Sequence, residues 1–448
     1  MSKKLLIYFT LIFLFILVIF SFGNYITGNY DKQNKIIVLL KKIIPSDYAK
    51  KIRDTLFYIP KMKERNNYLE LIVKKHEQGL NGELFSSEVV KSDKNNSYKL
   101  EKFFLPFNKL DLTVQWTKVD NTQNRHYIEI IDDYLVCFSG RNKIIYFPIS
   151  NSNKDKLNQK EILNNLNKIL SDNNFEPMGI RDIFYDGNLI FVSLFFKDNK
   201  GYSMNIYKAK MNYEKLNFEL FFKSNIYWDI FSVRTGGRIQ DYKNNKLIYS
   251  FGDVNNEEFA QDNNSLKGKI ISINKDNGSY QILSKGHRNQ QGLFYDNELD
   301  LIINTEHGPA GGDEVNLNFN LDEKIEDFGW PTASYGTRYK GEDTYKKSHK
   351  DYGFIEPFKN YNPGLGISEV IFEKNYNNEN KNYLFVSSLR AGSIYKIQVN
   401  EKLDKIIDEE RIFFPGQRIR DIKYHKNSKT FFMLFETIPS IAVLKEVD

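Results

Sequence analysis

The chain has 448 residues, of which 41% are hydrophobic and 15% aromatic, and its formal net charge at pH 7 is +6. This apolar content can support a sizeable core, and all-β folds often run this long as one unit. The charge is modest and spread along the chain, with no basic block interleaved with aromatics, so we do not expect nucleic acid as a partner. The single cysteine, Cys137, excludes an intramolecular disulfide and a multi-cysteine metal site.

The N-terminal segment has the pattern of a membrane anchor. Lys3 and Lys4 precede an apolar run from Leu5 to Phe22. At about 1.5 Å per residue, a helix of this length nearly crosses the hydrocarbon core of a bilayer. No clear small-x-small cleavage site follows, so we expect residues 1–30 to form an uncleaved transmembrane helix. Its basic end would lie in the cytoplasm and the main domain on the periplasmic or extracellular side, although lysines also follow the run. A cleaved signal peptide is the alternative.

Residues 31–109 are expected to form a short helical stalk and a connector. Apolar residues recur at helical spacing from Ile36 to Phe57, and a second helical piece is expected over Lys61–Gln78. The segment from Glu83 to Lys109 is polar and indicates no regular element. The helical part either joins the anchor to the main body, which we favour, or lies on the membrane surface, where its lysines would attract anionic headgroups.

From about residue 110 to residue 448 the chain becomes a series of short apolar runs separated by polar turns, which predicts a sandwich, a barrel or a propeller. About 340 residues is too much for one sandwich and suits about six four-stranded blades. No tight sequence repeat accompanies this pattern. The clearest expected strands are Tyr134–Phe138, Ile144–Pro148, Leu189–Phe195, Leu247–Phe251, Ile270–Ile273, Leu299–Asn304, Tyr383–Ser387, Ser393–Val399 and Thr430–Phe435.

Polar motifs follow several of these strands directly. Gly252-Asp253, the Glu306–Pro309 loop and the Ser388–Gly392 loop each come straight after an apolar strand. Motifs that sit at the same kind of strand end should gather on one face of a propeller. We expect a ligand site on that face.

Most familiar catalytic patterns are absent. The sequence has no H-E-x-x-H, Walker A, G-x-S-x-G or dinucleotide motif, and none of its six histidines is paired at metal spacing. Arginines in glycine-rich surroundings remain: Arg234, Arg238, Arg288, Arg390, Arg418 and Arg420. Arginine binds carboxylates and phosphates through a planar fork, so their convergence on one face would make an anion pocket. For any single arginine, a surface salt bridge is the alternative.

Five motifs then occur in one order: Gly286–Leu293, Glu306–Asn316, Phe328–Pro331, Ser388–Gly392 and Arg418–Ile422. Together they resemble the glucose/sorbosone dehydrogenase family, the soluble aldose sugar dehydrogenases that depend on pyrroloquinoline quinone (PQQ). The resemblance runs from roughly residue 110 to the C-terminus.

The resemblance implies an all-β, six-bladed β-propeller with PQQ lying over its top face. By motif position, the cofactor contacts would be Arg288, Asn289, Arg390, Arg418 and Arg420. It also implies a Ca²⁺ ion held by the backbone carbonyls of Gly308 and Pro309. Such an ion takes oxygen ligands and would polarise the quinone carbonyl that accepts hydride.

One position departs from the family pattern. In the family a histidine stands two residues before Gly-Gly-Arg and acts as general base on the sugar C1 hydroxyl, whereas here Arg234 occupies that place. Arginine stays protonated and cannot act as a base, and proton transfer is commonly worth roughly 10²–10⁴-fold in rate. His287, His307 or a carboxylate would have to substitute. The family's early glutamine segment, expected near Thr117–Ile128, is not recognisable.

Three functions remain open from the sequence. The first is an exported, membrane-tethered, PQQ-dependent dehydrogenase that oxidises a sugar or related alcohol with altered base chemistry. The second is a catalytically inactive propeller that binds a ligand or partner. The third is a lactonase-type hydrolase that uses propeller-bound calcium, although the carboxylate cage that it needs is not visible. The sequence identifies neither the substrate nor the electron acceptor.

Overall fold

The computed structural model describes residues 82–105, 125–319, 321, 324–436 and 440–447. The predicted anchor (residues 1–30) and the predicted helical stalk lie outside these residues. Within the part of the chain that is described, no helix is long and apolar enough to span a membrane.

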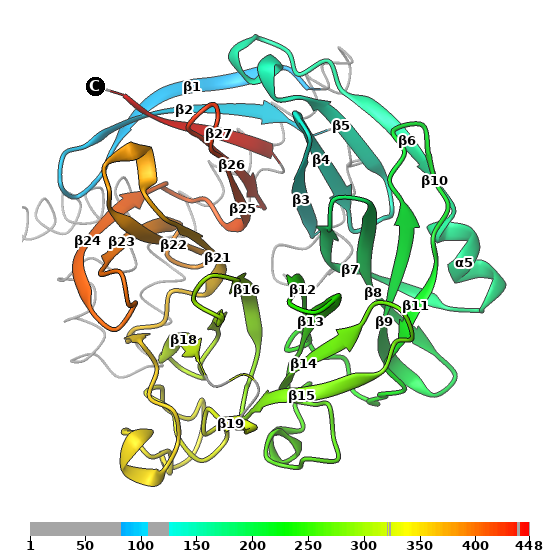
Figure 1. Cartoon of the computed structure of the whole chain (residues 1–448), viewed down its shortest axis with the longest axis vertical. Helices are drawn as coiled ribbons and strands as arrows, with labels where there is room; N and C mark the ends of the chain where they lie inside the picture. The colour runs from blue at the N-terminus through cyan, green and yellow to red at the C-terminus, as the bar shows by residue number, and fades with distance from the viewer. Residues whose placement is uncertain (1–81, 106–124, 320, 322–323, 437–439, 448) are drawn as a thin grey trace, which may run out of the picture. The chain divides into compact units, whose positions relative to one another are not determined.

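Six sheets of four or five strands stand around a central axis (Figure 1), which confirms the predicted all-β, six-bladed propeller. The first two blades are β3 (His126–Ile131), β4 (Tyr134–Ser139), β5 (Ile144–Pro148), β6 (Lys160–Asn164) and β10 (Lys215–Leu216), then β7 (Glu176–Tyr185), β8 (Leu189–Asp198), β9 (Gly201–Lys210) and β11 (Glu219–Lys223). The next two are β12 (Gly236–Tyr242), β13 (Lys246–Phe251), β14 (Lys269–Asn274), β15 (Tyr280–Lys285) and β19 (Glu326–Asp327), then β16 (Gln290–Asp296), β17 (Leu301–Glu306), β18 (Asp313–Asn318) and β20 (Lys359–Tyr361). The fifth blade is β21 (Ile367–Glu373), β22 (Asn382–Ser388), β23 (Ser393–Val399) and β24 (Ile406–Phe413).

The sixth blade combines the two ends of the described chain. The C-terminal strands β25 (Ile419–His425), β26 (Thr430–Phe435) and β27 (Ser440–Val447) pair with β2 (Ser97–Phe104), which in turn pairs with β1 (Leu84–Lys91). The segment expected to be a polar connector therefore supplies two strands. Buried Tyr98 and Leu100 flank exposed Lys99, which is the two-residue period of a half-buried strand, and the many charged neighbours obscured it.

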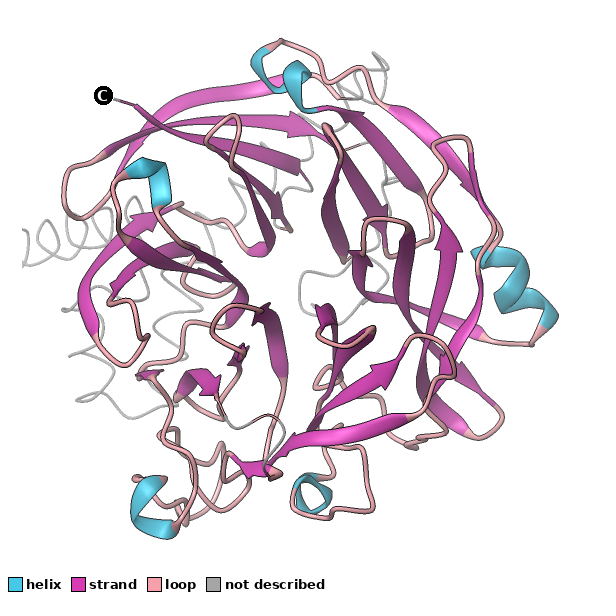
Figure 2. Cartoon of the chain, in the orientation of Figure 1, coloured by secondary structure: helices cyan, strands magenta, loops and turns pink. Residues whose placement is uncertain are grey.

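In the part of the chain that the structure describes, helical structure is confined to short pieces between strands (Figure 2). They are η2 (Ile149–Asn153), α5 (Leu166–Asp172), η3 (Glu257–Ala260), η4 (Lys350–Tyr352) and η5 (Tyr376–Asn378). The core lies between neighbouring blades, where apolar side chains of one sheet pack against the next. One such layer joins Ile183 and Val192 of the second blade to Val136 and Phe138 of the first.

The strand order brings the sequence motifs to one end of the axis. In the first five blades, the first strand along the chain is the innermost. In the sixth blade, the innermost strand β25 likewise precedes β26 and β27. The inner strands β3, β7, β12, β16, β21 and β25 therefore run in one direction, and neighbouring members of this ring contact one another, with β25 meeting β3. Loops that precede an inner strand, and loops that follow the antiparallel second strand, consequently share the same end of the propeller.

Candidate functional site

Arg288 is a fixed residue at this end of the propeller. It comes two residues before β16 and only 7% of it is exposed. Its backbone N–H donates to Glu306 Oε2 (2.9 Å), and its Nη1 donates to the carbonyls of His307 (2.9 Å) and Gly308 (2.8 Å). The guanidinium carbon lies 5.3 Å from the ring centre of Trp330, a cation–π distance. These contacts hold the side chain in one orientation.

Arg234 is paired with a buried carboxylate. Its Nη1 donates to Asp253 Oδ2 (2.9 Å) and its Nε to Asn255 Oδ1 (2.6 Å). The Trp330 indole donates to the same Asp253 oxygen at 2.9 Å. Burial lowers the pKa of Arg234, although Asp253 opposes that shift, and burial raises the pKa of Asp253 against the opposing effect of Arg234. The cation and the carboxylate thus form one closed unit, and neither is arranged as a proton acceptor.

The two histidines that sequence reasoning offered as substitute bases lie in different surroundings. His287 is fully buried, with Nε2 2.7 Å from Ser284 Oγ and its ring stacked on Phe328. That makes it part of the packing beneath the loops. His307 is half-buried, and its Nε2 lies 2.5 Å from the carbonyl oxygen of Ile367. A carbonyl only accepts hydrogen bonds, so Nε2 of His307 carries the proton and Nδ1 is left as an acceptor.

Asn289 fixes the free nitrogen of His307. Its Nδ2 lies 3.5 Å from His307 Nδ1, while its Oδ1 accepts from Gln291 Nε2 at 3.0 Å. Burial lowers the pKa of His307, and the cations Arg288 and Arg420 act in the same direction, against Asp313. The imidazole is therefore neutral near pH 7, and its one acceptor lone pair, on Nδ1, faces the Asn289 amide across a long 3.5 Å contact.

Arg418 and Arg420 share a single carboxylate, Glu436, which follows β26. Arg420 Nε donates to Glu436 Oε1 (2.6 Å) and Arg418 Nε to Oε2 (3.2 Å). Burial alone would raise the pKa of Glu436, but Arg420 and Arg418 outweigh it and lower the pKa to about 2. Arg420 also donates from Nη1 to Gln291 Oε1 at 3.0 Å.

Gln291 connects the two groups of predicted residues. Its oxygen accepts from Arg420 and its nitrogen donates to Asn289. The structure therefore links Arg288, Asn289, Arg418 and Arg420 in one network, and their contact with a cofactor stays a prediction. Sequence reasoning had not assigned a role to Gln291, although it lies within the Gly286–Leu293 motif.

Arg390 stands apart from this network. It follows β22 and is exposed, and within the described residues its guanidinium has no hydrogen bond or ion pair. Its backbone is nonetheless fixed, because its N–H donates to the Leu365 carbonyl at 3.0 Å. A side chain anchored at its base and unpaired at its tip is available to a ligand.

Sequence reasoning missed one arginine of the cluster, Arg125. It stands directly before β3, as Arg418 stands directly before β25. Burial lowers its pKa to about 10, and the neighbouring cation Arg420 adds to that shift. The recurring position, an arginine just before an inner strand, was the signal that could have found it.

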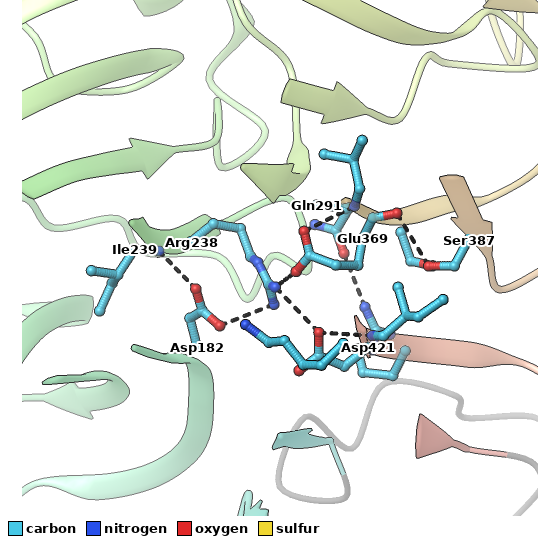
Figure 3. Close-up of polar contacts among 12 residues, drawn as sticks. Asp182, Arg238, Ile239, Gln291, Glu369, Ser387 and Asp421 are labelled. Carbon is cyan, nitrogen blue, oxygen red and sulfur yellow. Dashed lines mark hydrogen bonds and ion pairs between the residues drawn. The ribbon is translucent and has the colours of Figure 1, made fainter. Parts of the chain in front are cut away.

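Arg238, also singled out from the sequence, belongs to a different structure in the centre of the propeller (Figure 3). From β12 it pairs with Asp182 of β7 (3.1 Å), Asp421 of β25 (3.4 Å) and Glu369 of β21. Asp421 in turn accepts from the backbone of Ile128 in β3 at 2.9 Å. This network ties five of the six inner strands together, so Arg238 stabilises the ring and is not part of the anion pocket.

The Gly308-Pro309 step was expected to hold calcium through its carbonyl oxygens. The Gly308 oxygen instead accepts from Arg288, and the Pro309 oxygen accepts from the Tyr339 hydroxyl at 2.9 Å. Within the described residues, no group of three or more His, Cys, Asp or Glu side chains could hold a metal ion. These residues do not fit a Ca²⁺ site.

The arginine cluster does fit a polycarboxylate such as PQQ. Arg125, Arg418 and Arg420 have Glu436 as their shared carboxylate neighbour, and Arg390 forms no ion pair with any described residue. A buried excess of positive charge is costly unless an anion compensates it. Two or more ligand carboxylates would do so, with Arg390 free to add a further contact.

The six-bladed propeller with an arginine-rich end agrees with the resemblance that the motifs indicated. The chain matches the Glucose / Sorbosone dehydrogenase family over residues 178–437, more than half of its length, and it belongs to that family. It is 29% identical over 207 residues to the Aldose sugar dehydrogenase YliI of Escherichia coli (strain K12), which covers 42% of this chain and 53% of that protein. The chain spans about half the length of the curated relatives that it matches.

Solved structures share the fold. The soluble aldose sugar dehydrogenase from Escherichia coli in its apo-form is 17% identical, with a TM-score of 0.57 over 81% of this chain and 99% of that one. The PQQ-bound aldose sugar dehydrogenase from Streptomyces coelicolor is 16% identical, with a TM-score of 0.52 over 72% of this chain and 98% of that one. At these identities the likeness concerns the fold alone.

Proposed function

We propose that this chain is an exported, membrane-tethered, PQQ-dependent dehydrogenase that oxidises a sugar or related alcohol, and that its proton acceptor is not at position 234. The observation that carries the proposal is the cluster of Arg125, Arg418 and Arg420 around Glu436, which leaves positive charge for a polycarboxylate to neutralise. Membership of the Glucose / Sorbosone dehydrogenase family supports this choice of cofactor. The predicted apolar segment of residues 1–30 is the basis for tethering and export.

Bound PQQ would supply the hydride acceptor. The chain's own residues have other tasks. Arg418 and Arg420 hold the carboxylates, and Gln291 sets the position of Arg420 relative to Asn289. Arg288 places its guanidinium at the Gly308 carbonyl, in the loop that follows β17. Calcium has no role in this proposal, because the Gly308 carbonyl already accepts from Arg288 and the Pro309 carbonyl from Tyr339.

His307 is the group that we propose accepts the substrate proton. Its Nε2–H is held by the Ile367 carbonyl, and its Nδ1 has only the long 3.5 Å contact with the Asn289 amide, which a substrate hydroxyl would displace. Burial keeps its pKa below the usual value, so the neutral form prevails at physiological pH. Arg234 cannot perform this step, and its Asp253 partner already accepts hydrogen bonds from Arg234 and Trp330.

The test is cofactor binding and turnover measured on the full chain in detergent. PQQ should bind with a stoichiometry of about one per chain, and an artificial dye should be reduced with one or more members of an aldose and alcohol panel. His307→Gln should keep PQQ affinity and lose roughly 10²–10⁴-fold in kcat. Failure of PQQ to bind would contradict the whole proposal, whereas an active His307→Gln would contradict only the role of His307.

The second candidate is a catalytically inactive propeller that binds a ligand or partner. The Arg234–Asp253 pair favours it, because this position holds a fixed cation where a family dehydrogenase would need a base. Tight PQQ binding without dye reduction by any substrate of the panel would identify this second function.

A further inference from the structure

Three consecutive carbonyl oxygens in the loop after β17 accept hydrogen bonds from donors of the chain itself. The His307 and Gly308 oxygens accept from Arg288 Nη1 at 2.9 and 2.8 Å. The Pro309 oxygen accepts from the Tyr339 hydroxyl at 2.9 Å. A cation at the Gly308-Pro309 step would need these same oxygens as ligands.

Arg288 is held at this place from several sides. Its backbone N–H is bonded to Glu306, its guanidinium faces the Trp330 ring, and the residue is almost fully buried. A divalent cation at the Gly308 oxygen would lie against this positive charge. Like charges so close repel strongly in a partly buried site. The carboxylates of Glu306 and Asp313 lie nearby, but each already accepts a backbone N–H of this loop region.

The neighbouring carboxylate is also committed. Asp313 Oδ1 accepts from the Gly308 N–H (3.1 Å) and its Oδ2 accepts from the Ile367 N–H (3.0 Å). Ca²⁺ takes about six to eight oxygen ligands. The Gly308 and Pro309 oxygens each have one lone pair taken by a donor, and the remaining lone pair of the Gly308 oxygen lies beside the Arg288 guanidinium. Position 308 accepts only glycine, because a Cβ there would lie 2.2 Å from the Gly312 carbonyl oxygen.

Arg288 keeps one donor in reserve. Its Nε is buried and has no hydrogen-bond partner within the described residues. A buried N–H without a partner is costly, and a ligand oxygen would remove that cost. The guanidinium can therefore offer positive charge and a directed N–H to a ligand that lies over this loop.

We propose that the Arg288 guanidinium and the Tyr339 hydroxyl take the place of a divalent cation at the Gly308-Pro309 step, so that this face of the propeller binds its ligand without a metal ion. That no cation binds at the Gly308-Pro309 step does not depend on the proposed function. That the ligand binds without a metal ion rests on the proposed use of PQQ, and a separate experiment tests each point.

The first experiment titrates the full chain in detergent, after treatment with a chelator, with Tb³⁺ and with Ca²⁺ alone. We expect no heat of stoichiometric binding up to about 1 mM and no Tb³⁺ emission sensitised by Trp330. Trp330→Phe is the matched control. Emission that this variant loses would place the metal beside Trp330 and overturn the inference, and so would emission that only Tyr339→Phe removes, because Tyr339 lies at the same step. Emission that survives both substitutions comes from elsewhere and leaves the inference standing.

The second experiment measures the Kd of PQQ with EDTA and with about 1 mM Ca²⁺. We expect the two values to agree within about twofold, and a loss of tenfold or more in EDTA would overturn the inference. If PQQ binds under neither condition, the proposed function fails, and the titration with metal alone still decides whether the Gly308-Pro309 step holds a cation.

Discussion

The Arg234 guanidinium lies 2.9 Å from Oδ2 of Asp253, whose side chain is completely buried. Removing the arginine would leave a buried carboxylate with only the Trp330 indole, the Asn255 backbone and its remaining neighbours to stabilise it. Position 234 is therefore defined by a charge pair. Any substitution at this position also removes the cation that pairs with the Asp253 carboxylate.

In a chain that also carries His307→Gln, Arg234→His is expected to raise dye reduction by about 10²-fold or more. A neutral imidazole at this position could accept a proton while its other nitrogen donates to Asp253. The rate measured against pH should then show an acid limb that reports the new imidazole. Arg234→Gln is the matched control, because it removes the charge without adding a base. If the histidine variant binds PQQ and gains no more activity than the glutamine variant, the missing base is not what limits turnover.

Arg181→Met is expected to stabilise the protein. Arg181 is 1% exposed, and among the described residues none of its three guanidinium nitrogens has a hydrogen-bond partner. Its guanidinium carbon lies 4.3 Å from the ring centre of Phe195, and burial lowers its pKa well below the usual value. Replacing such a buried charge with an apolar side chain should raise the free energy of unfolding by about 1–3 kcal/mol, measured with urea.

Arg238→Met is the matched comparison. It removes the same charge from another buried position, but it leaves Asp182, Asp421 and Glu369 without their common cation. We expect a loss of about 3–5 kcal/mol in the free energy of unfolding. If both variants raised, or both lowered, the free energy of unfolding, the ion pairs that Arg238 makes in the inner ring would not be what distinguishes these two arginines.

The sequence predicts the architecture well, because short apolar runs and polar turns are local signals. Of the expected strands, Tyr134–Phe138 and Leu247–Phe251 lie within observed strands. The site is predicted only where a motif marks it, as with Arg288 and Arg418. The Gly252-Asp253 motif was expected at this end, but the pairing of Asp253 with Arg234 was not, and Tyr339 and Arg125 come from parts of the chain that meet these residues only in the folded ring. No local pattern states that Tyr339 donates to the Pro309 carbonyl across thirty positions of sequence.

Acid should unfold the protein partly through Glu436. Its pKa is about 2 in the folded chain, below the ordinary value of 4.5, because Arg420 and Arg418 outweigh the opposing effect of burial. A depressed pKa contributes stability that is present above pH ~4.5 and is lost as the pH falls toward 2. The contribution is up to about 3 kcal/mol. Urea titrations from pH 7 to pH 2 should show a smaller loss over this window in Glu436→Gln, and an identical pH dependence in both proteins would contradict the assignment.

Arg390→Gln and Arg420→Gln should separate ligand binding from stability. The Arg390 guanidinium is exposed and has no ion pair within the described residues, so its loss should leave the urea midpoint unchanged and weaken PQQ binding about five- to tenfold. Arg420 contacts both Glu436 and Gln291, so its loss should weaken PQQ binding and also lower the free energy of unfolding by about 3 kcal/mol. Raising the salt concentration should narrow the affinity difference between Arg390→Gln and the unmodified chain, because an exposed charge is screened within about 10 Å. An Arg390→Gln variant with unchanged PQQ affinity at low salt would show that the ligand does not reach the loop after β22.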